Sequence, residues 1–259
     1  MSRGRFFVVY FALTFMSTFV GCSGRQEKTS LVIAAAANTR FAMEKIIDAY
    51  KQQSASKVDM IISSSGKLTA QIENGAPYDV FISADLKYPT RLHKKGLTTG
   101  PPVIYAKGSL VLWTTSLEKI SIEKLRKSHI EVIAMANPDL APYGVAAKEA
   151  LVSYQLWDSL KTKMVYGESV SQANQFILSG NAQAGFTAKS VVLAPKMQHN
   201  GSWIEVDRQS YEPILQGAVI IKQANSRSQQ AEAQKFLDFM LSPAGQDIFL
   251  SFGYQDADE

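Results

Sequence analysis

Apolar and polar positions follow one another in a strand-then-helix order over the first part of the chain. Three short apolar runs predict buried strands, at 31–37, 58–62 and 80–83. The segment after the first run has apolar residues on one helical face, at Met43, Ile46, Ile47 and Tyr50. Shorter helices are expected at 68–73 and 85–95. Repeated strand–helix units favour a mainly parallel sheet.

A second series of the same kind begins after the break at Gly100-Pro101-Pro102. Strands are expected at 110–114, 130–136, 163–166 and 184–187, with helices at 142–154 and around 173–180. A late strand at 218–222 precedes two closing helices, around 233–240 and from Ser242-Pro243 onward. The sequence thus predicts an α/β protein of two lobes, each a mainly parallel sheet flanked by helices. We expect lobe one at 30–106 and 220–259, and lobe two at 107–219.

The first 21 residues have the pattern of a secretory signal. Arg3 and Arg5 precede an apolar run, 6–20, which falls short of the roughly 20 residues that a spanning helix needs. The only cysteine, Cys22, follows directly, so no intramolecular disulfide can form. The string Phe19-Val20-Gly21-Cys22 resembles a bacterial lipobox, which predicts lipidation of Cys22 and a tether at 22–29. Plain cleavage nearby and an uncleaved anchor are the alternatives. If Cys22 is lipidated, or if the signal is simply cleaved nearby, the protein lies in the periplasm or at the cell surface.

Composition and charge exclude several partners. Hydrophobic residues make up 46% of the chain and charged residues 19%, as in an ordinary globular protein. The formal net charge is +4, and removing the signal takes away Arg3 and Arg5. The remaining chain is near neutral and has no basic cluster, so we expect no nucleic-acid partner.

Motifs for enzyme chemistry are missing. No metal-ligand spacing joins the three histidines, His93, His129 and His199. There is no Gly-x-Ser-x-Gly elbow for a nucleophilic serine. The string Ser65-Gly66-Lys67-Leu68 looks like the end of a P-loop, but Ile61 and Leu68 stand where that motif needs Gly and Ser or Thr. We therefore expect a binding protein with no cofactor and no direct cation ligands.

Four strands end in small or polar residues that lead straight into a helix. These segments are Ala37-Asn38-Thr39, Ser63-Ser64-Ser65-Gly66, Ala141-Pro142-Tyr143-Gly144 and Glu168-Ser169-Val170-Ser171. A helix N-terminus leaves about four N–H groups unpaired and carries roughly half a positive charge, so it can bind an anion. One such serine or asparagine is explained by helix capping alone. Two in each half of the chain leave capping and a shared anion site both open.

At these segments the sequence resembles the molybdate-binding proteins of ABC importers, from Leu31 to Tyr254. The most specific motif is the run at 75–85, Gly-Ala-Pro-Tyr-Asp-Val-Phe-Ile-Ser-Ala-Asp. The others are Ala34-Ala35-Ala36-Ala37-Asn38, Ser64-Ser65-Gly66-Lys67-Leu68, Asn137-Pro138, Ala141-Pro142-Tyr143-Gly144, Gly167-Glu168-Ser169-Val170, Gly185-Phe186-Thr187-Ala188 and Leu241-Ser242-Pro243-Ala244-Gly245. The resemblance implies a type II, two-lobed periplasmic-binding-protein fold with an oxyanion held between the lobes.

Carried over by position, the resemblance implies four binding residues: Asn38, Ser65, Tyr143 and Val170, the last through its backbone N–H. Ala37, Thr39 and Ser64 are weaker candidates beside them. Many family members place a tyrosine where this chain has Ala188. In a second branch the tyrosine stands in the Ala-Pro-Tyr-Gly segment, which implies that Tyr143 supplies the hydroxyl here.

The sequence therefore predicts a monomeric protein that captures molybdate or tungstate and delivers it to the membrane permease of an ABC importer. The two anions are nearly isosteric, so the sequence does not separate them. The first alternative is a binder of the same fold for sulfate, phosphate or ferric ion. The second is a secreted enzyme that uses the same cleft, for which no nucleophile–base pair is present.

Overall fold

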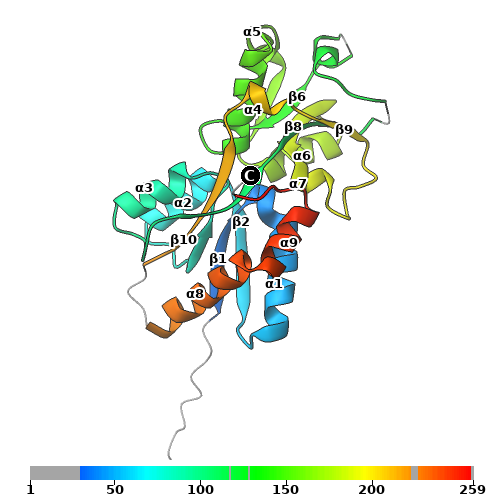
Figure 1. Ribbon diagram of the computed structural model, residues 1–259. Helices are drawn as coiled ribbons and strands as arrows, with labels where there is room; N and C mark the ends of the chain where they lie inside the picture. The colour runs from blue at the N-terminus through cyan, green and yellow to red at the C-terminus, as the bar shows by residue number, and fades with distance from the viewer. Residues whose placement is uncertain (1–29, 117, 128, 223–226, 258–259) are drawn as a thin grey trace, which may run out of the picture.

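Two five-stranded sheets, each covered by helices, form the two lobes of the computed structural model (Figure 1). The structure describes residues 30–116, 118–127, 129–222 and 227–257. The predicted signal, the tether and Cys22 lie outside the described residues. Within those residues, no helix is both long and apolar enough to cross a membrane.

The first sheet has the strand order β2-β1-β3-β10-β4. Its strands are β1 Leu31–Ala36, β2 Val58–Ser63, β3 Val80–Ile82, β4 Val103–Gly108 and β10 Ile214–Ile220. Strand β1 pairs in parallel with β2 and β3, whereas β10 is antiparallel to both β3 and β4. The reversed strand is the one that returns from the second lobe.

The second sheet has the order β7-β6-β8-β5-β9. Its strands are β5 Leu110–Thr114, β6 Ile133–Ala136, β7 Met164–Gly167, β8 Ala184–Ala188 and β9 Ser202–Glu205. Strand β6 pairs in parallel with β7 and β8, and β5 is antiparallel to β8 and β9. Here the reversed strand is the one that enters from the first lobe. Both sheets are thus mixed, because each contains one strand that runs opposite to its neighbours.

Seven helices of eight residues or more cover the described parts of the sheets. They are α1 Arg40–Gln53, α2 Ser65–Glu73, α3 Lys87–Lys94, α4 Pro142–Ser153, α6 Val170–Leu178, α8 Arg227–Leu241 and α9 Pro243–Ser251. Short α-helices are α5 Trp157–Leu160 and α7 Lys189–Val192, and the 3-10 turns are η1 Ala37–Thr39, η2 Glu123–Arg126, η3 Lys161–Lys163 and η4 Arg208–Ser210. Their N-termini follow the sequence signals: serines cap α2, α6 and α9, and proline occupies the first turn of α4 and α9.

Each lobe has its own apolar core. In the first lobe, residues such as Ile33, Met43 and Phe236 pack between the sheet and α1, α8 and α9. In the second, Met135 and Phe186 belong to a cluster with the buried face of α4. That second cluster also includes Ala36, Ala37 and Ala84 of the first lobe. The lobes therefore meet through packed side chains where β1 and β3 end.

Three strands differ from the sequence prediction. The late strand was expected at 218–222, but β10 already pairs with the first sheet from Ile214, ahead of the predicted return at 220. Pro213 and the polar Gln216 interrupt the apolar run and hide its beginning. Strands β4 and β9 were not predicted. Strand β4 continues into β5 through Ser109 alone, so the first crossover is a nearly continuous extended segment.

Candidate functional site

The structure brings all four predicted binding residues to the contact between the lobes, and all four are buried. Asn38 lies in η1, after β1, and Ser65 begins α2, after β2. Tyr143 is the second residue of α4, and Val170 begins α6. Their exposed fractions are 2%, 1%, 2% and 4%. Ala37, Tyr143 and Val170 belong to one apolar cluster that spans both lobes.

Asn38 uses its side-chain amide within the protein. Its Nδ2 donates to Oε1 of Gln216 at 2.8 Å and to the hydroxyl of Tyr254 at 3.2 Å. Its backbone carbonyl accepts from the hydroxyls of Ser190, at 2.8 Å, and Tyr254, at 3.1 Å. Both amide hydrogens therefore have acceptors, and what Asn38 can offer to an anion is its backbone N–H.

The neighbours of Asn38 differ in what they can donate. The hydroxyl of Thr39 donates to the carbonyl of Ala36 at 2.7 Å, so that hydrogen is already used. Ala37 has no side-chain donor and can contribute only its backbone N–H. The side-chain hydrogens of Asn38 and Thr39 thus already have acceptors, and the groups this segment can still offer are the backbone N–H groups before α1.

Ser65 stands at the start of α2 with its hydroxyl held in place. The oxygen Oγ accepts from the backbone N–H of Ala84 at 3.0 Å, which leaves the hydroxyl hydrogen directed elsewhere. The preceding Ser64 is the N-cap and accepts from the N–H of Lys67 at 3.4 Å. Ser64 therefore completes the helix end, whereas Ser65 can donate both its hydroxyl and its backbone N–H.

Tyr143 directs its hydroxyl at the crossover between the lobes. Nε2 of Gln216 lies 3.4 Å from that oxygen and donates to it. Burial raises the pKa of Tyr143 well above its ordinary value, and the nearby Tyr254 and Tyr211 add to the rise. The amides of Asn38 and Gln216 oppose it. The phenol is therefore neutral at physiological pH and keeps its hydrogen as a donor.

Val170 is the first residue of α6. Ser169 is the N-cap, and its hydroxyl accepts from the N–H of Gln172 at 3.3 Å. The N–H groups of Val170 and Ser171 precede the first intrahelical bonds and carry the positive end of the helix dipole. The side chain of Val170 is buried in the apolar cluster between the lobes, so the group it could offer to an anion is its backbone N–H.

Sequence reasoning missed the buried polar residues behind the site: Gln216, Tyr105, Tyr254 and Ser190. One signal could have found Gln216, because it is the single polar side chain in the run from Ile214 to Ile220. Buried polar groups are almost always hydrogen-bonded, so a lone amide in a core strand predicts a network. The two tyrosines carry no comparable sequence signal.

Charges lie at the rim of the site. Lys67 of α2 forms an ion pair with Glu168, just before α6, so the pair joins the two lobes. Their side chains are 39% and 61% exposed, and both face solvent more than the buried residues between them. Among the described residues, no group of three or more acidic, histidine or cysteine side chains could hold a metal ion.

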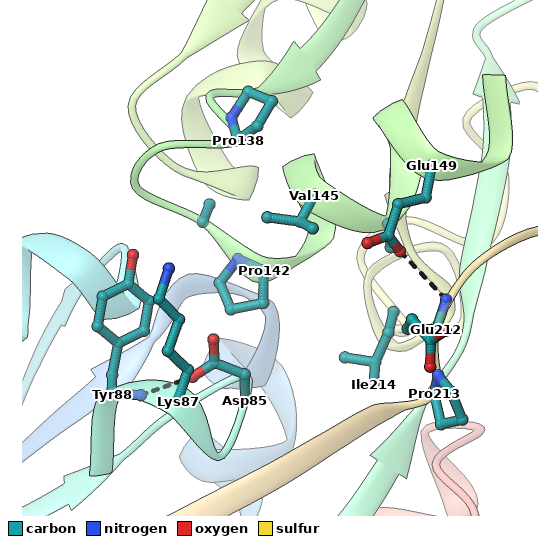
Figure 2. Close-up of a pocket in the computed structure, with 12 residues that line it drawn as sticks. Asp85, Lys87, Tyr88, Pro138, Pro142, Val145, Glu149, Glu212, Pro213 and Ile214 are labelled. Carbon is teal, nitrogen blue, oxygen red and sulfur yellow. Dashed lines mark hydrogen bonds between the residues drawn. The ribbon is translucent and has the colours of Figure 1, made fainter. Parts of the chain in front are cut away.

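A groove between the lobes runs beside these residues without including any of the four (Figure 2). It has a volume of about 180 Å³ and is lined by Asp85 and Tyr88 on one side and by Pro142, Val145 and Glu149 on the other. Burial raises the pKa of Asp85 above its ordinary value. The groove reaches Pro142, the residue before Tyr143, and the four predicted residues themselves are buried.

Known proteins resemble the chain along almost the whole of the described part. The family described as bacterial extracellular solute-binding protein matches residues 31–255. The chain belongs to this family. The molybdate-binding protein ModA of Azotobacter vinelandii is 35% identical over 86% of this chain and 88% of its own length. ModA of Rhodobacter capsulatus is 34% identical over 86% and 87%.

A solved structure supports the same relationship. The periplasmic molybdate-binding protein of Azotobacter vinelandii superposes with a TM-score of 0.81 at 33% identity, covering 87% of this chain and 98% of that one. The predicted two-lobed fold is thereby confirmed, with mixed rather than mainly parallel pairing in each sheet. The resemblance to molybdate-binding proteins is also confirmed, as is the choice of an extracellular binding protein over an enzyme.

Proposed function

We propose that this solute-binding protein captures molybdate or tungstate between its lobes and delivers the anion to the permease of an ABC importer. The observation that carries the proposal is the burial of Asn38, Ser65, Tyr143 and Val170 at one interlobe contact, in a chain 35% identical to a molybdate-binding protein. Neutral donors at helix N-termini stabilise an anion without a cationic side chain.

The proposed donors are backbone N–H groups of Ala37 and Asn38, the hydroxyl and N–H of Ser65, the hydroxyl of Tyr143, and the N–H of Val170. Each belongs to a strand–helix junction, so its direction is fixed by the fold rather than by a mobile loop. Donors held in place in this way enclose a space of fixed size, and we call this set of donors the ring. Mo–O and W–O bonds are longer than S–O and P–O bonds, so the ring would favour the larger anions.

The protonation state of the ligand follows from the same donor set. Backbone N–H groups and a neutral phenol donate hydrogen bonds and carry no negative charge. Such donors do not require the ligand to carry a proton. A site with a buried carboxylate facing the anion would instead favour a protonated oxyanion. We therefore propose a fully deprotonated dianion as the ligand. Sulfate is the alternative that shares this charge, and phosphate shares it in part.

Location and assembly complete the proposal. Lipidation of Cys22 would tether a monomer at the outer face of the membrane, where a permease could receive the anion. The lobes would open about the crossovers at Ser109 and before Ile214, since these connect the two sheets.

A thermal-shift panel tests the function. A ligand that binds only the folded protein raises the melting temperature, by an amount that grows with its concentration over Kd. Molybdate and tungstate are expected to raise it at concentrations where sulfate and phosphate do not. An equal shift with sulfate would assign the protein to the sulfate alternative, and no shift with any oxyanion would contradict the proposal.

A further inference from the structure

Gln216 lies at the centre of a buried hydrogen-bond network that joins both lobes. It is wholly inaccessible to solvent and belongs to the crossover strand β10. Its Oε1 accepts from Nδ2 of Asn38 at 2.8 Å and from the hydroxyl of Tyr105 at 2.8 Å. Its Nε2 donates to Tyr143 of the second lobe. The pairing of β10 with β4 shifts register directly after Gln216, an irregularity that can re-aim a side chain.

The orientation of each amide follows from where the hydrogens go. Tyr254 has one hydroxyl hydrogen, which it donates to the backbone carbonyl of Asn38. Toward the side-chain amide of Asn38, the hydroxyl oxygen of Tyr254 can therefore only accept. Asn38 must therefore present its NH₂ group to Tyr254, and the second hydrogen of that group faces Gln216. Only Oε1 of Gln216 can accept it. The NH₂ group of Gln216 is thus turned toward Tyr143.

This orientation determines what Tyr143 does with its own hydrogen. Because its oxygen accepts from Gln216, the hydroxyl hydrogen of Tyr143 is directed away from that amide and toward another acceptor. In the closed protein the proposed anion is that acceptor. The distance of 3.4 Å is long for such a bond, so the hydroxyl retains room to move toward the ligand.

Gly108 at the end of β4 makes the contact possible. A Cβ at this position would lie 2.2 Å from the hydroxyl oxygen of Tyr143 and 2.6 Å from Nε2 of Gln216. Neither distance is compatible with a real side chain, and both neighbours are buried. The crossover strands therefore leave a space that the Tyr143–Gln216 contact fills.

We propose that Gln216 is a positioning residue for oxyanion binding, which fixes Asn38 in the first lobe and the hydroxyl hydrogen of Tyr143 in the second. The inference rests on the proposed function. It deepens that function by adding a residue that does not itself touch the ligand. It also gives strand β10 a part in binding, because the Gln216 amide is hydrogen-bonded to a residue of each lobe.

Replacing Gln216 by glutamate gives a sharp test, because protonation of one group switches the network. While the carboxyl group of the Gln216→Glu variant is protonated, it can accept from Asn38 and donate to Tyr143, as the amide does. Once ionised, the carboxylate can only accept, so it takes the hydrogen of Tyr143 and places a negative charge near the anion. Molybdate affinity of Gln216→Glu should approach that of the original protein at mildly acidic pH and fall about tenfold per pH unit above the carboxyl pKa.

Two matched variants separate this effect from others. Gln209→Glu makes the same chemical change at an exposed position of η4 and should leave affinity independent of pH. Gln216→Met removes the hydrogen bonds without adding charge and should weaken binding about tenfold. If Gln216 acts through Tyr143, adding Gln216→Met to a Tyr143→Phe variant should lower molybdate affinity little further, because the two changes remove the same interaction.

Calorimetric titration of molybdate into each full-length variant decides the matter. A pH-dependent loss in Gln216→Glu and non-additive losses in the double variant support the positioning role. A flat pH profile for Gln216→Glu, or losses of Gln216→Met and Tyr143→Phe that simply add, would overturn it while leaving the proposed function intact. Absence of molybdate binding by the unchanged protein would overturn the proposed function, and this inference with it. If Gln216→Met unfolds, the pH profile of Gln216→Glu alone decides.

Discussion

The backbone N–H of Gly66, in the first turn of α2, donates to the carbonyl of Leu140, just before α4, at 2.9 Å. This bond joins the two lobes beside Ser65. It is accompanied by a second interlobe bond, from the hydroxyl of Tyr88 to the carbonyl of Asp139 at 3.2 Å. The contact between the lobes is thus held by neutral hydrogen bonds next to the proposed site, and not by side-chain charge alone.

Gly66→Ala should prevent this closure. An added Cβ would lie 2.8 Å from the hydroxyl of Tyr88 and 2.9 Å from the carbonyl oxygen of Leu140, which is backbone and cannot rotate away. We expect molybdate affinity to fall at least about tenfold, while the melting temperature without ligand changes little. Gly100→Ala is the control, because nothing lies within 4 Å of its added Cβ. Small-angle scattering with and without molybdate measures closure; compaction of Gly66→Ala equal to that of the control would contradict the expectation.

The Lys67–Glu168 ion pair should contribute little to affinity. Both side chains are substantially exposed, and exposed pairs are weak and screened by salt. Lys67→Met is expected to change the molybdate dissociation constant by no more than about threefold, and less at high salt. Titrations at low and high ionic strength measure this. A large loss that persists at high salt would show instead that Lys67 acts as a ligand.

Tyr143→Phe should weaken molybdate binding by about tenfold or more, since it removes one buried hydroxyl donor from the site. The raised pKa of Tyr143 implies that the hydroxyl of the original protein stays protonated throughout the neutral range. Affinity should therefore be flat with pH there and decline only in strongly alkaline solution. Tyr154→Phe, a partly exposed tyrosine beyond the end of α4, is the control. Unchanged affinity in Tyr143→Phe would remove this residue from the proposed donor set.

Glu232 should make the free energy of unfolding depend on pH without changing the affinity for the ligand. Hydrogen bonds from Ser56, Tyr50 and Ser54 lower its pKa from 4.5 to about 2, against the opposing effect of burial. A lowered pKa in the folded state stabilises the fold above the ordinary carboxyl pKa, and this contribution is lost as pH falls from about 4.5 toward about 2.

Glu232→Gln should accordingly lower the free energy of unfolding at neutral pH by about 1 kcal/mol and reduce its loss in acid. Urea unfolding at several pH values measures both effects. Molybdate affinity should stay unchanged, because Glu232 binds Tyr50 of α1 and the loop before β2, away from the proposed site. A Glu232→Gln curve that parallels the original at every pH would contradict the assignment.

Much of the fold could be predicted because local pattern and tertiary environment agree. The strand at 110–114 and the start of α4 at Pro142 lie where the sequence placed them. Strand β4 was missed because the charged Lys107 and the glycine at its end interrupt the expected apolar run, and the start of β10 because Gln216 does. Pairing direction could not be read either, since it depends on which strand carries the chain between lobes.

The candidate site also has a part that could be predicted from the sequence and a part that could not. Helix starts are local features, so Asn38, Ser65, Tyr143 and Val170 could be named from strand–helix junctions and from the family resemblance. The network behind them is not local: Tyr254 lies 216 residues from Asn38 along the chain, and Gln216 lies 178 residues away. No periodicity links positions so distant. The use of the Asn38 amide inside the protein, rather than on the ligand, therefore became visible only in three dimensions.

Competition between molybdate and sulfate, followed by calorimetric titration of the purified protein, tests the central claim most directly. We expect one site per chain for molybdate, with tungstate competing for it and sulfate failing to displace either at comparable concentration. Sulfate binding as tight as molybdate binding, or no heat of binding with molybdate, would contradict it.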